Sequence, residues 1–343
     1  MSLLESPALE LYTRAPLKAI LSGEHSVVYG YPCIAMALNL YTSGRARIIR
    51  DAKYPSSFPF PVLLDKETGE RLDLSSSMGE AVRLVNEEIL IRLTTTEQSG
   101  KACYYCESVE ITVHKWALGK GLGSSASILV SHAALLLAAS SIYSLSLLFD
   151  VSLLGENYIH GQTTGMDLKT VIYGGIQVYS HKTLCNSRIP SDILLAHGIQ
   201  ILIADSDITK STAQAVKLVR QRQNDNTLAQ IGSISESLIE LLSSTSSASK
   251  ASDEDFRLAL SSIIQQNHAL LCSLGVSVPQ IEHSREALYH TGCFAAKLTG
   301  AGLGGCCLGL RRQGDSTMTD SNMRILEVSI GEGLIVTKMP CQV

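Results

Sequence analysis

Two spacings of apolar residues alternate along this chain, and each predicts one kind of secondary structure. Short apolar runs and strict apolar–polar alternation predict strands, whereas apolar positions that recur every three or four residues predict helices. Strand patterns cover residues 15–21, 33–38, 44–49, 108–114, 175–179, 198–204, 295–298, 305–310 and 333–338. Helical patterns cover the residues after 125 and residues 78–93, 145–160, 209–223, 228–242, 253–274, 279–289 and about 320–327. Helices mixed with antiparallel strands predict an α+β fold.

A polar stretch that contains a proline, residues 180–192, separates the two halves of this pattern. The chain has 343 residues, which is a length typical of two domains. We therefore predict a first domain over residues 1–185 and a second domain over residues 186–343.

The segment between Lys120 and Asp150 contains no Asp, Glu, Lys or Arg. A run of that length is enough to cross a bilayer, which takes about 20 apolar residues. However, serines and His132 interrupt the run, and neither flank carries a basic cluster or an aromatic belt. The pattern therefore favours two buried helices that break near residues 140–144.

Composition and charge narrow the class of protein. Hydrophobic residues make up 45% of the chain and charged residues 17%, which is typical of a globular protein and excludes a disordered one. A net charge of -4 and an aromatic content of 5% supply neither the basic surface nor the stacking platform that nucleic-acid binding needs. We expect no nucleic-acid partner and no membrane span.

The nine cysteines are odd in number and lack the spacing of a disulfide framework, which indicates free thiols in a reducing compartment. Cys103 and Cys106 have metal-ligand spacing, but a structural zinc site needs about four ligands and only His114 could add one. Buried thiols are the preferred interpretation. Residues 1–13 lack the basic segment of a secretory signal. We expect a cytoplasmic location and leave import into an organelle open.

Two glycine-rich loops are candidates for anion binding. Residues 119–126 (Gly-Lys-Gly-Leu-Gly-Ser-Ser-Ala) lead directly into a predicted helix. Glycines let the backbone N–H groups curl around one point, and the helix N-terminus adds a positive potential, so phosphate is the ligand that such a loop fits. The alternative is a flexible turn in which Ser124 caps the helix. Residues 299–305 form a second glycine-rich loop, for which a tight hairpin is the alternative.

Charged side chains next to these loops are candidates for chemistry. Lys18 lies in an apolar strand, where a lysine needs either an exposed face or a partner. Glu156 and His160 are four residues apart and share a helix face, and Asp167 follows that helix. These three side chains either form a polar wall that faces the first loop or are solvated surface groups.

Four motifs in order along the chain resemble those of one family, the GHMP kinases. They are Ala-Pro-Leu-Lys at 15–18 with Gly-Glu-His-Ser-Val-Val-Tyr-Gly at 23–30, Gly-Leu-Gly-Ser-Ser-Ala at 121–126, the segment 156–167, and Lys-Leu-Thr-Gly-Ala-Gly at 297–302. The resemblance spans residues 15–308. It implies a two-domain fold with a ribosomal-protein-S5-like N-terminal domain and a ferredoxin-like α/β C-terminal domain. The first motif is most similar to that of the branch that phosphorylates mevalonate.

The resemblance implies a transferase that uses ATP to phosphorylate the C5 hydroxyl of (R)-mevalonate, a step of isoprenoid and sterol biosynthesis. It implies that Asp167 is the general base, paired with Lys18, and that Ser125 and Glu156 hold the Mg²⁺ that accompanies ATP. The implied substrate-binding residues are Lys18, Glu24, His25, Asp167 and Thr212. The implied ATP-binding residues are Gly121, Leu122, Gly123, Ser124, Ser125, Ala126, Gly300, Ala301 and Gly302.

Lys120 departs from the family pattern, which has a small residue at this position. Its ammonium group either contacts a phosphate, which adds Lys120 to the ATP-binding candidates, or is solvated on the outer rim of the loop. Two other functions stay open for the chain: another small-molecule GHMP kinase, such as a galactokinase or a phosphomevalonate kinase, and a relative without catalysis that acts as a sensor. A homodimer also stays open.

Overall fold

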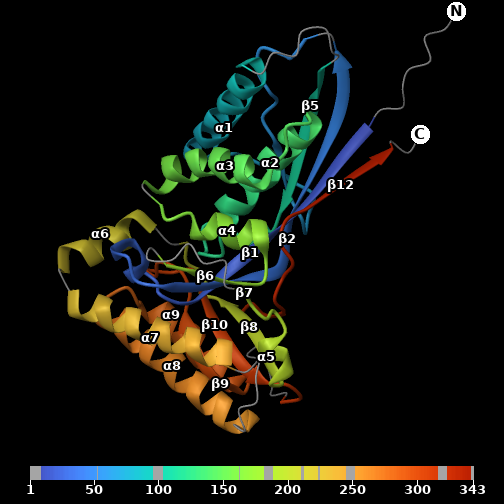
Figure 1. Cartoon of the computed structure of the whole chain (residues 1–343). Coiled ribbons are helices and arrows are strands. Elements are labelled where there is room, and N and C mark those ends of the chain that lie inside the picture. The colour runs from blue at the N-terminus through green and yellow to red at the C-terminus, as the bar shows by residue number, and fades with distance from the viewer. Residues whose placement is uncertain are drawn as a thin grey trace, which may run out of the picture.

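The computed structural model describes residues 9–51, 53–95, 103–161, 163–180, 188–209, 212–222, 225–244, 252–315 and 323–340. Within these ranges the chain forms two sheets with helices packed on them, stacked along the long axis of the molecule (Figure 1). The α+β fold predicted from the sequence is confirmed.

The first sheet has the strand order β12-β1-β2-β5-β3-β4, and β6 and β7 extend it from β2. Its strands are β1 (Leu9–Ser22), β2 (Cys33–Asp51), β3 (Val62–Asp65), β4 (Arg71–Leu72), β5 (Cys103–Val113), β6 (Ile176–Tyr179), β7 (Arg188–Ile189) and β12 (Ile335–Pro340). The helices on this sheet are α1 (Ser76–Thr95), α2 (Ser124–Ala139), α3 (Leu145–His160) and α4 (Met166–Tyr173). A short 3-10 helix, η1 (Ser26–Tyr29), follows β1, and a second, η2 (Lys115–Ala117), follows β5.

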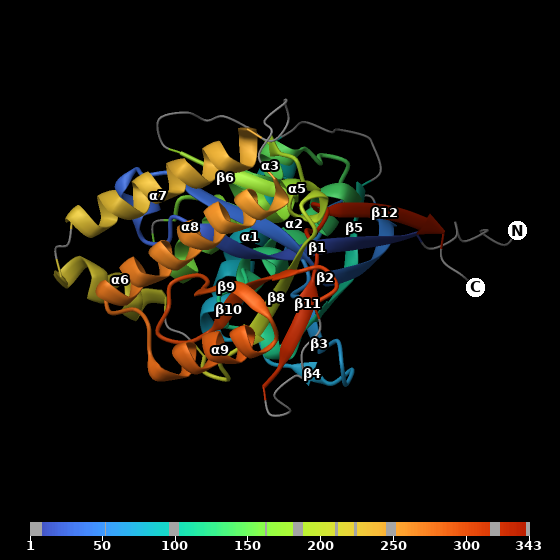
Figure 2. The same cartoon turned by 90° about the horizontal axis from the view of Figure 1, so that it is seen from below.

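The second sheet has the order β11-β8-β10-β9, and all its pairings are antiparallel. Its strands are β8 (Ile199–Asp205), β9 (Cys293–Leu298), β10 (Cys306–Arg312) and β11 (Ile325–Val328). The helices of this half are α5 (Ile193–Ala196), α6 (Thr212–Arg222), α7 (Asp225–Ser244), α8 (Asp253–Ser273) and α9 (Pro279–His290). Seen from below, α7 and α8 run side by side next to this sheet (Figure 2).

One buried cluster joins the two halves. It combines apolar side chains of β1 and β2, such as Leu17 and Met36, with Ile201 of β8, Leu308 of β10 and Leu260 of α8. Burial of apolar surface stabilises this contact by roughly 25 cal/mol per Å². The last strand, β12, also returns to the first sheet and pairs with β1. The two halves therefore share a core.

Most of the predicted elements are confirmed, and two differences have clear causes. The segments 33–38 and 44–49 belong to one strand, β2, because β1 pairs with both of them and a register shift takes the place of the expected turn. The helix expected near 320–327 is wrong for residues 325–327, because Ile325–Val328 forms the strand β11. It pairs with the side of β8 that β10 leaves open, and the hydrogen bonds of this pairing override the local helical pattern. Residues 320–322 lie outside the described ranges.

The apolar segment after Lys120 folds as two helices, α2 and α3, with the break near residues 140–144 as predicted. Helix α2 is buried along almost its whole length, whereas α3 buries one face only and exposes Leu154 and Tyr158, so the prediction of a buried helix is wrong for α3. Among the described residues, none of the helices combines the length and the apolar character that a bilayer span requires. The proposed boundary between residues 185 and 186 falls in a stretch that the structure does not describe, so the two domain ranges stay predictions.

Candidate functional site

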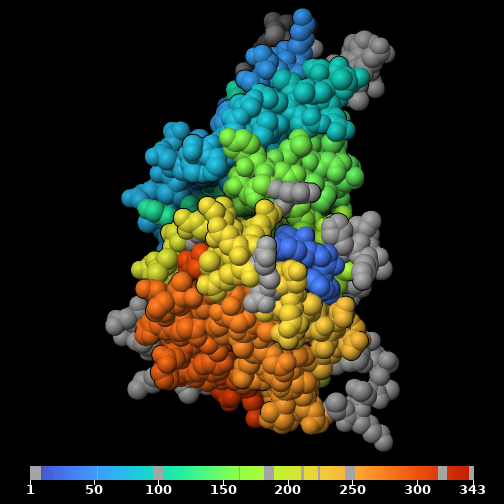
Figure 3. Space-filling view, turned by 90° about the vertical axis from the view of Figure 1, so that its left-hand side faces the viewer, coloured from blue at the N-terminus to red at the C-terminus, as the bar shows by residue number. Residues whose placement is uncertain are grey.

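A cavity of about 770 Å³ lies where the two halves meet. Segments from the whole chain line it: β1 and the turn after it, the loop before α2, the end of α3, the start of α4, the start of α6, and the loop between β9 and β10. In the space-filling view, residues of the first quarter (blue), the middle of the chain (green) and α6 (yellow) meet on one face (Figure 3). The cavity therefore collects the predicted motifs.

The first glycine-rich loop has the geometry of an anion site. Gly119, Gly121 and Gly123 have φ angles of 70°, 87° and 72°, in the left-handed region that favours glycine. Helix α2 begins at Ser124, and its N-cap is Gly123, without a side-chain cap hydrogen bond. The alternative with Ser124 as the N-cap is therefore wrong. Since no side chain caps this helix, the N–H groups of its first turn are available to an anion.

Lys18 packs directly under this loop. Its backbone N–H donates to the carbonyl oxygen of Leu122 at 2.8 Å, which ties β1 to the loop. A Cβ atom at Gly123 would lie 2.8 Å from Cγ of Lys18, so only glycine lets the loop approach the lysine this closely. The lysine that the sequence singled out thus lies beside the first glycine-rich loop.

Lys18 also has the partner that its apolar strand requires. Its Nζ atom is 3.1 Å from Oδ2 of Asp167, and the side chain of Lys18 is 3% exposed while that of Asp167 is 32% exposed. Asp167 lies in the first turn of α4, where the helix dipole favours a carboxylate. Gly165 caps this helix with a φ of 72°. Asp167 is therefore a fixed carboxylate at the cavity wall, held by a buried cation.

Two further side chains with oxygen atoms that could bind a metal ion lie at the same wall. The hydroxyl of Ser125 lies 3.1 Å from Nε2 of His160, and the same nitrogen lies 3.9 Å from Oε2 of Glu156. Glu156 is buried, and all three side chains line the cavity. His160 thus links the two predicted metal ligands, a contact that their sequence positions do not reveal. A hydroxyl and a carboxylate are a donor pair that suits a hard cation such as Mg²⁺.

The turn after β1 is held by the second half of the molecule. Glu24 forms an ion pair with Lys297 of β9, and both side chains are almost fully buried. Lys297 also donates to the carbonyl oxygen of Leu298 at 2.8 Å. Burial raises the pKa of the Glu24 carboxyl, and Lys297 acts in the opposite direction. Sequence reasoning gave Lys297 no role of its own.

Two more hydrogen bonds join this turn to the second glycine-rich loop. The Nε2 atom of His25 is 2.9 Å from the carbonyl oxygen of Ala301. The N–H of Ile20 donates to the hydroxyl of Thr299 at 2.7 Å. The first and last motifs therefore form one unit although they lie at opposite ends of the chain.

Most of the predicted site residues line the cavity. They are Lys18, Glu24, His25, Gly121, Gly123, Ser124, Ser125, Glu156, Asp167, Thr212, Gly300 and Ala301. Four predicted ATP-binding residues are not among the described residues that line the cavity: Lys120, Leu122, Ala126 and Gly302. Leu122 and Ala126 are fully buried core residues. Lys210, a second lysine that the sequence places near enough to approach an anion, lies outside the described residues.

Lys120 differs from its predicted environment. Its side chain is 8% exposed, so the prediction of a solvated rim residue is wrong. The Nζ atom lies 2.9 Å from Oδ1 of Asp205, at the end of β8. The ammonium group is thus paired inside the protein, and sequence reasoning did not identify its partner.

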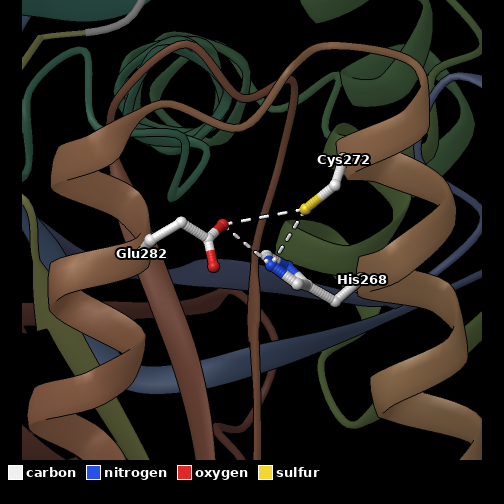
Figure 4. Close-up of side chains that lie close together, drawn as sticks. All are labelled: His268, Cys272 and Glu282. Carbon is white, nitrogen blue, oxygen red and sulfur yellow. Dashed lines mark hydrogen bonds and ion pairs between the residues drawn. The ribbon is translucent and has the colours of Figure 1, made fainter.

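A second polar cluster lies away from the cavity. His268 and Cys272 on α8 converge on Glu282 of α9 (Figure 4), with Nε2 of His268 3.0 Å from Oε1 of Glu282 and 3.3 Å from Sγ of Cys272. The N–H of Leu298 donates to Nδ1 of His268, so the neutral ring carries its proton on Nε2, the nitrogen that a metal would need. Glu282 also accepts from Arg285. This cluster is a closed hydrogen-bond network.

The two cysteines with metal-ligand spacing are buried, as predicted. Cys103 and Cys106 lie on β5 and are buried. Among the described residues, the only group of His, Cys, Asp and Glu side chains close enough to share a metal ion is the cluster of His268. The interpretation of Cys103 and Cys106 as buried thiols is therefore confirmed.

Comparisons with known proteins agree with these motifs. A family model described as the GHMP kinases N terminal domain matches residues 86–175, and one described as GHMP kinases C terminal matches residues 248–316. The mevalonate kinase of Pyrococcus abyssi (strain GE5 / Orsay) is 31% identical over 321 residues, which cover 86% of this chain and 87% of that protein.

Solved structures share the fold. One is the L. major mevalonate kinase in complex with R-mevalonate, with a TM-score of 0.64, 20% identity, and coverage of 93% of this chain and 95% of that one. Another is the Lactococcus lactis galactokinase complexed with galactose, with a TM-score of 0.66, 15% identity and coverage of 95% of both chains. The structure with galactose and the structure with R-mevalonate have similar TM-scores to this chain. Similarity of fold alone therefore does not identify the acceptor.

Proposed function

The chain belongs to the GHMP kinase family, and we propose that it transfers the terminal phosphoryl group of ATP to the C5 hydroxyl of (R)-mevalonate. The observation that carries the proposal is the ion pair between Lys18 and Asp167, which lies in the wall of a cavity that also contains the phosphate loop. The acceptor is supported by the full-length similarity to proteins named mevalonate kinase.

Asp167 acts as the general base. Its carboxylate takes the proton of the C5 hydroxyl while the hydroxyl oxygen forms a bond to the γ-phosphorus and the bond from that phosphorus to the ADP oxygen breaks. Lys18 fixes the carboxylate in position and supplies a positive charge near the transferred group. Positioning and charge supply most of the catalysis in phosphoryl transfer.

The residues next to the loop fit a magnesium ion that arrives with ATP. Ser125 and Glu156 offer a hydroxyl and a carboxylate at one wall, and His160 connects them. A bound Mg²⁺ would neutralise charge on the phosphates. The N–H groups of the first turn of α2 and of the preceding loop bind the phosphate oxygens, and Gly300 and Ala301 close the other side.

Glu24, His25 and Thr212 orient the acceptor. Oε1 of Glu24 pairs with Lys297, whereas its other oxygen, Oε2, is buried without a hydrogen-bond partner among the described residues. A buried acceptor atom without a partner is costly, and a substrate hydroxyl would satisfy it. This supports Glu24 as a contact to a hydroxyl of mevalonate.

A single assay tests the acceptor. The purified chain with ATP and Mg²⁺ is given (R)-mevalonate, (S)-mevalonate, galactose or 5-phosphomevalonate, and ADP release is followed together with the phosphorus NMR spectrum of the product. We expect turnover with (R)-mevalonate and a signal of a phosphate monoester. Turnover with galactose or phosphomevalonate instead would replace the proposal by the corresponding kinase. ATP binding without ADP release for every acceptor would indicate a sensor.

We also propose the cytoplasm as the compartment of this enzyme. The cysteines that the structure describes are free thiols, and most are buried. Free thiols are typical of a reducing compartment. Imaging of the full-length chain fused to a fluorescent protein at either end would test this location, and an organellar signal would contradict it.

A further inference from the structure

Lys120 and Asp205 form a buried ion pair between the two halves of the molecule. The Nζ atom lies 2.9 Å from Oδ1 of Asp205, and each side chain is 8% exposed. Lys120 belongs to the phosphate loop, and Asp205 is the last residue of β8 in the second sheet. A second carboxylate, that of the fully exposed Asp207, lies 3.9 Å away. The ammonium group is therefore held by the second half and not by the cavity.

Backbone contacts reinforce this connection. The N–H of Cys306, at the start of β10, donates to the carbonyl oxygen of Lys120 at 3.1 Å, and Cys306 pairs in register with Asp205. Oδ1 of Asp205 also accepts from the N–H of Asp207 at 2.9 Å, which fixes the carboxylate. Next to Lys120, a Cβ atom at Gly119 would lie 2.7 Å from Cγ2 of Thr209. The loop is thus packed tightly onto the end of β8.

We propose that Lys120 and Asp205 are positioning residues that lock the phosphate loop onto the second sheet. A loop with three glycines has many accessible conformations, and ordering them on binding weakens affinity. An ion pair at the position between the first two glycines of the loop removes that cost before ATP arrives. Lys120 thus acts on ATP through the position of the loop, and its ammonium group does not contact a phosphate. This inference rests on the proposed ATP site but not on the identity of the acceptor.

Two single variants test the pair, each read by direct binding. Lys120→Met keeps most of the side-chain volume without the charge, and Asp205→Asn keeps size and shape without the charge. The Kd of a non-hydrolysable ATP analogue with Mg²⁺ is measured by calorimetry without acceptor, so the result does not depend on which alcohol is phosphorylated. We expect both variants to raise this Kd about tenfold, the effect of losing one charge-assisted contact. The kcat and the KM for mevalonate should stay within about twofold.

The double variant and a control complete the test. If the two residues act as one unit, Lys120→Met with Asp205→Asn should weaken ATP binding no more than either single change. The control is Glu327→Gln, which breaks the 2.9 Å ion pair with Arg311 elsewhere on the same sheet and should leave the Kd unchanged. If Asp205→Asn does not fold, Asp205→Glu keeps the charge but displaces the loop, and it should still raise the Kd.

Two outcomes would overturn the proposal. If Lys120→Met weakens ATP binding while both Asp205 variants leave it unchanged, the lysine contacts a phosphate directly. If the variants lower the melting temperature while the folded protein binds the analogue as tightly as the parent, the pair stabilises the fold only. Failure of the parent to phosphorylate mevalonate would contradict the proposed acceptor. It would not affect the comparison of Kd values for the ATP analogue, which is made without acceptor.

Discussion

The ammonium group of Lys18 lies 3.1 Å from Oδ2 of Asp167, and the two residues come from different layers of the same half. Lys18 is held in the middle of β1 by the apolar core, whereas Asp167 opens α4 and reaches the cavity. The lysine is buried and the aspartate is one-third exposed, so the carboxylate has one oxygen on the cation and room for a reactant on the open side. This arrangement suits a proton acceptor.

The base is tested by Asp167→Asn, which keeps the size of the side chain and removes its ability to accept a proton. We expect kcat to fall by at least about 10²-fold, the lower end for loss of a general base. The Kd for ATP should change by less than about twofold, because the phosphate loop is untouched. Asp150→Asn, at an exposed position of α3, is the matched control and should retain parent kinetics. Retention of more than half of the parent turnover by Asp167→Asn would exclude this role.

The metal contact is tested by Glu156→Gln, since an amide is a poorer ligand than a carboxylate for a hard cation. We expect the Mg²⁺ concentration for half-maximal activity to rise several-fold and kcat to fall. Electron paramagnetic resonance of Mn²⁺ with the ATP complex gives a readout besides activity and should show weaker binding. Glu236→Gln, at an exposed position of α7, is the control. An unchanged magnesium titration would remove Glu156 from the metal site.

Sequence reasoning found the parts of the site that have local signals. The spacing of the glycines located the phosphate loop. The backbone at Gly121 and Gly123 has left-handed φ angles, which favour glycine regardless of what the loop packs against. Lys18 could be found because a lysine in an apolar strand needs a partner. Helix α4 was not predicted, although its first turn positions Asp167, because eight residues carry too short a pattern.

The rest of the site depends on contacts between distant parts of the chain. Lys297 shows the same local signal as Lys18, but its partner Glu24 is 273 positions away, and no spacing rule connects them. Lys120 gives two interpretations from sequence, and neither includes the end of β8, because only the pairing of β8 with β10 brings Asp205 beside the loop. Burial decides these roles, and burial is a property of the folded chain.

The pair of Glu24 and Lys297 predicts a stability effect that depends on pH. In Lys297→Met the carboxyl of Glu24 stays buried without its cation, which should cost about 3–5 kcal/mol at pH 8. Burial already raises the pKa of Glu24, and loss of Lys297 removes the main opposing influence. The folded variant should therefore take up a proton at a higher pH than the unfolded chain, so that its stability rises relative to the parent as the pH falls.

Urea unfolding of the parent and of Lys297→Met at pH 8 and at pH 5.5 measures this difference. The variant should lose clearly less stability at pH 5.5. Glu24→Gln combined with Lys297→Met removes the titrating group, and the difference between the two pH values should disappear. An equal loss at both pH values in Lys297→Met would mean that Glu24 is not the group that titrates.

The buried His268 predicts a second pH effect with the opposite sign. Burial, assisted by the nearby Arg285, lowers the pKa of His268 to about 4, although Glu282 acts in the opposite direction. In the unfolded chain the imidazole has a pKa near 6.5. Between pH 6.5 and pH 4 the unfolded state therefore binds a proton at this ring and the folded state does not. Stability that is present above pH 6.5 is therefore lost as the pH falls toward 4. By pH 4.5 this loss should reach about 2–3 kcal/mol.

The variant His268→Gln isolates this contribution from every other titrating group. A glutamine amide can accept from the N–H of Leu298 and donate to Glu282, so the network should survive at pH 7 without a group that titrates. We expect the variant to lose about 2–3 kcal/mol less than the parent between pH 7 and pH 4.5 in urea unfolding. His283→Gln, at an exposed position of α9, should keep the pH profile of the parent. Parallel profiles for the parent and His268→Gln would mean that the folded protein accommodates the protonated ring, and that the network of Glu282 opens to receive it.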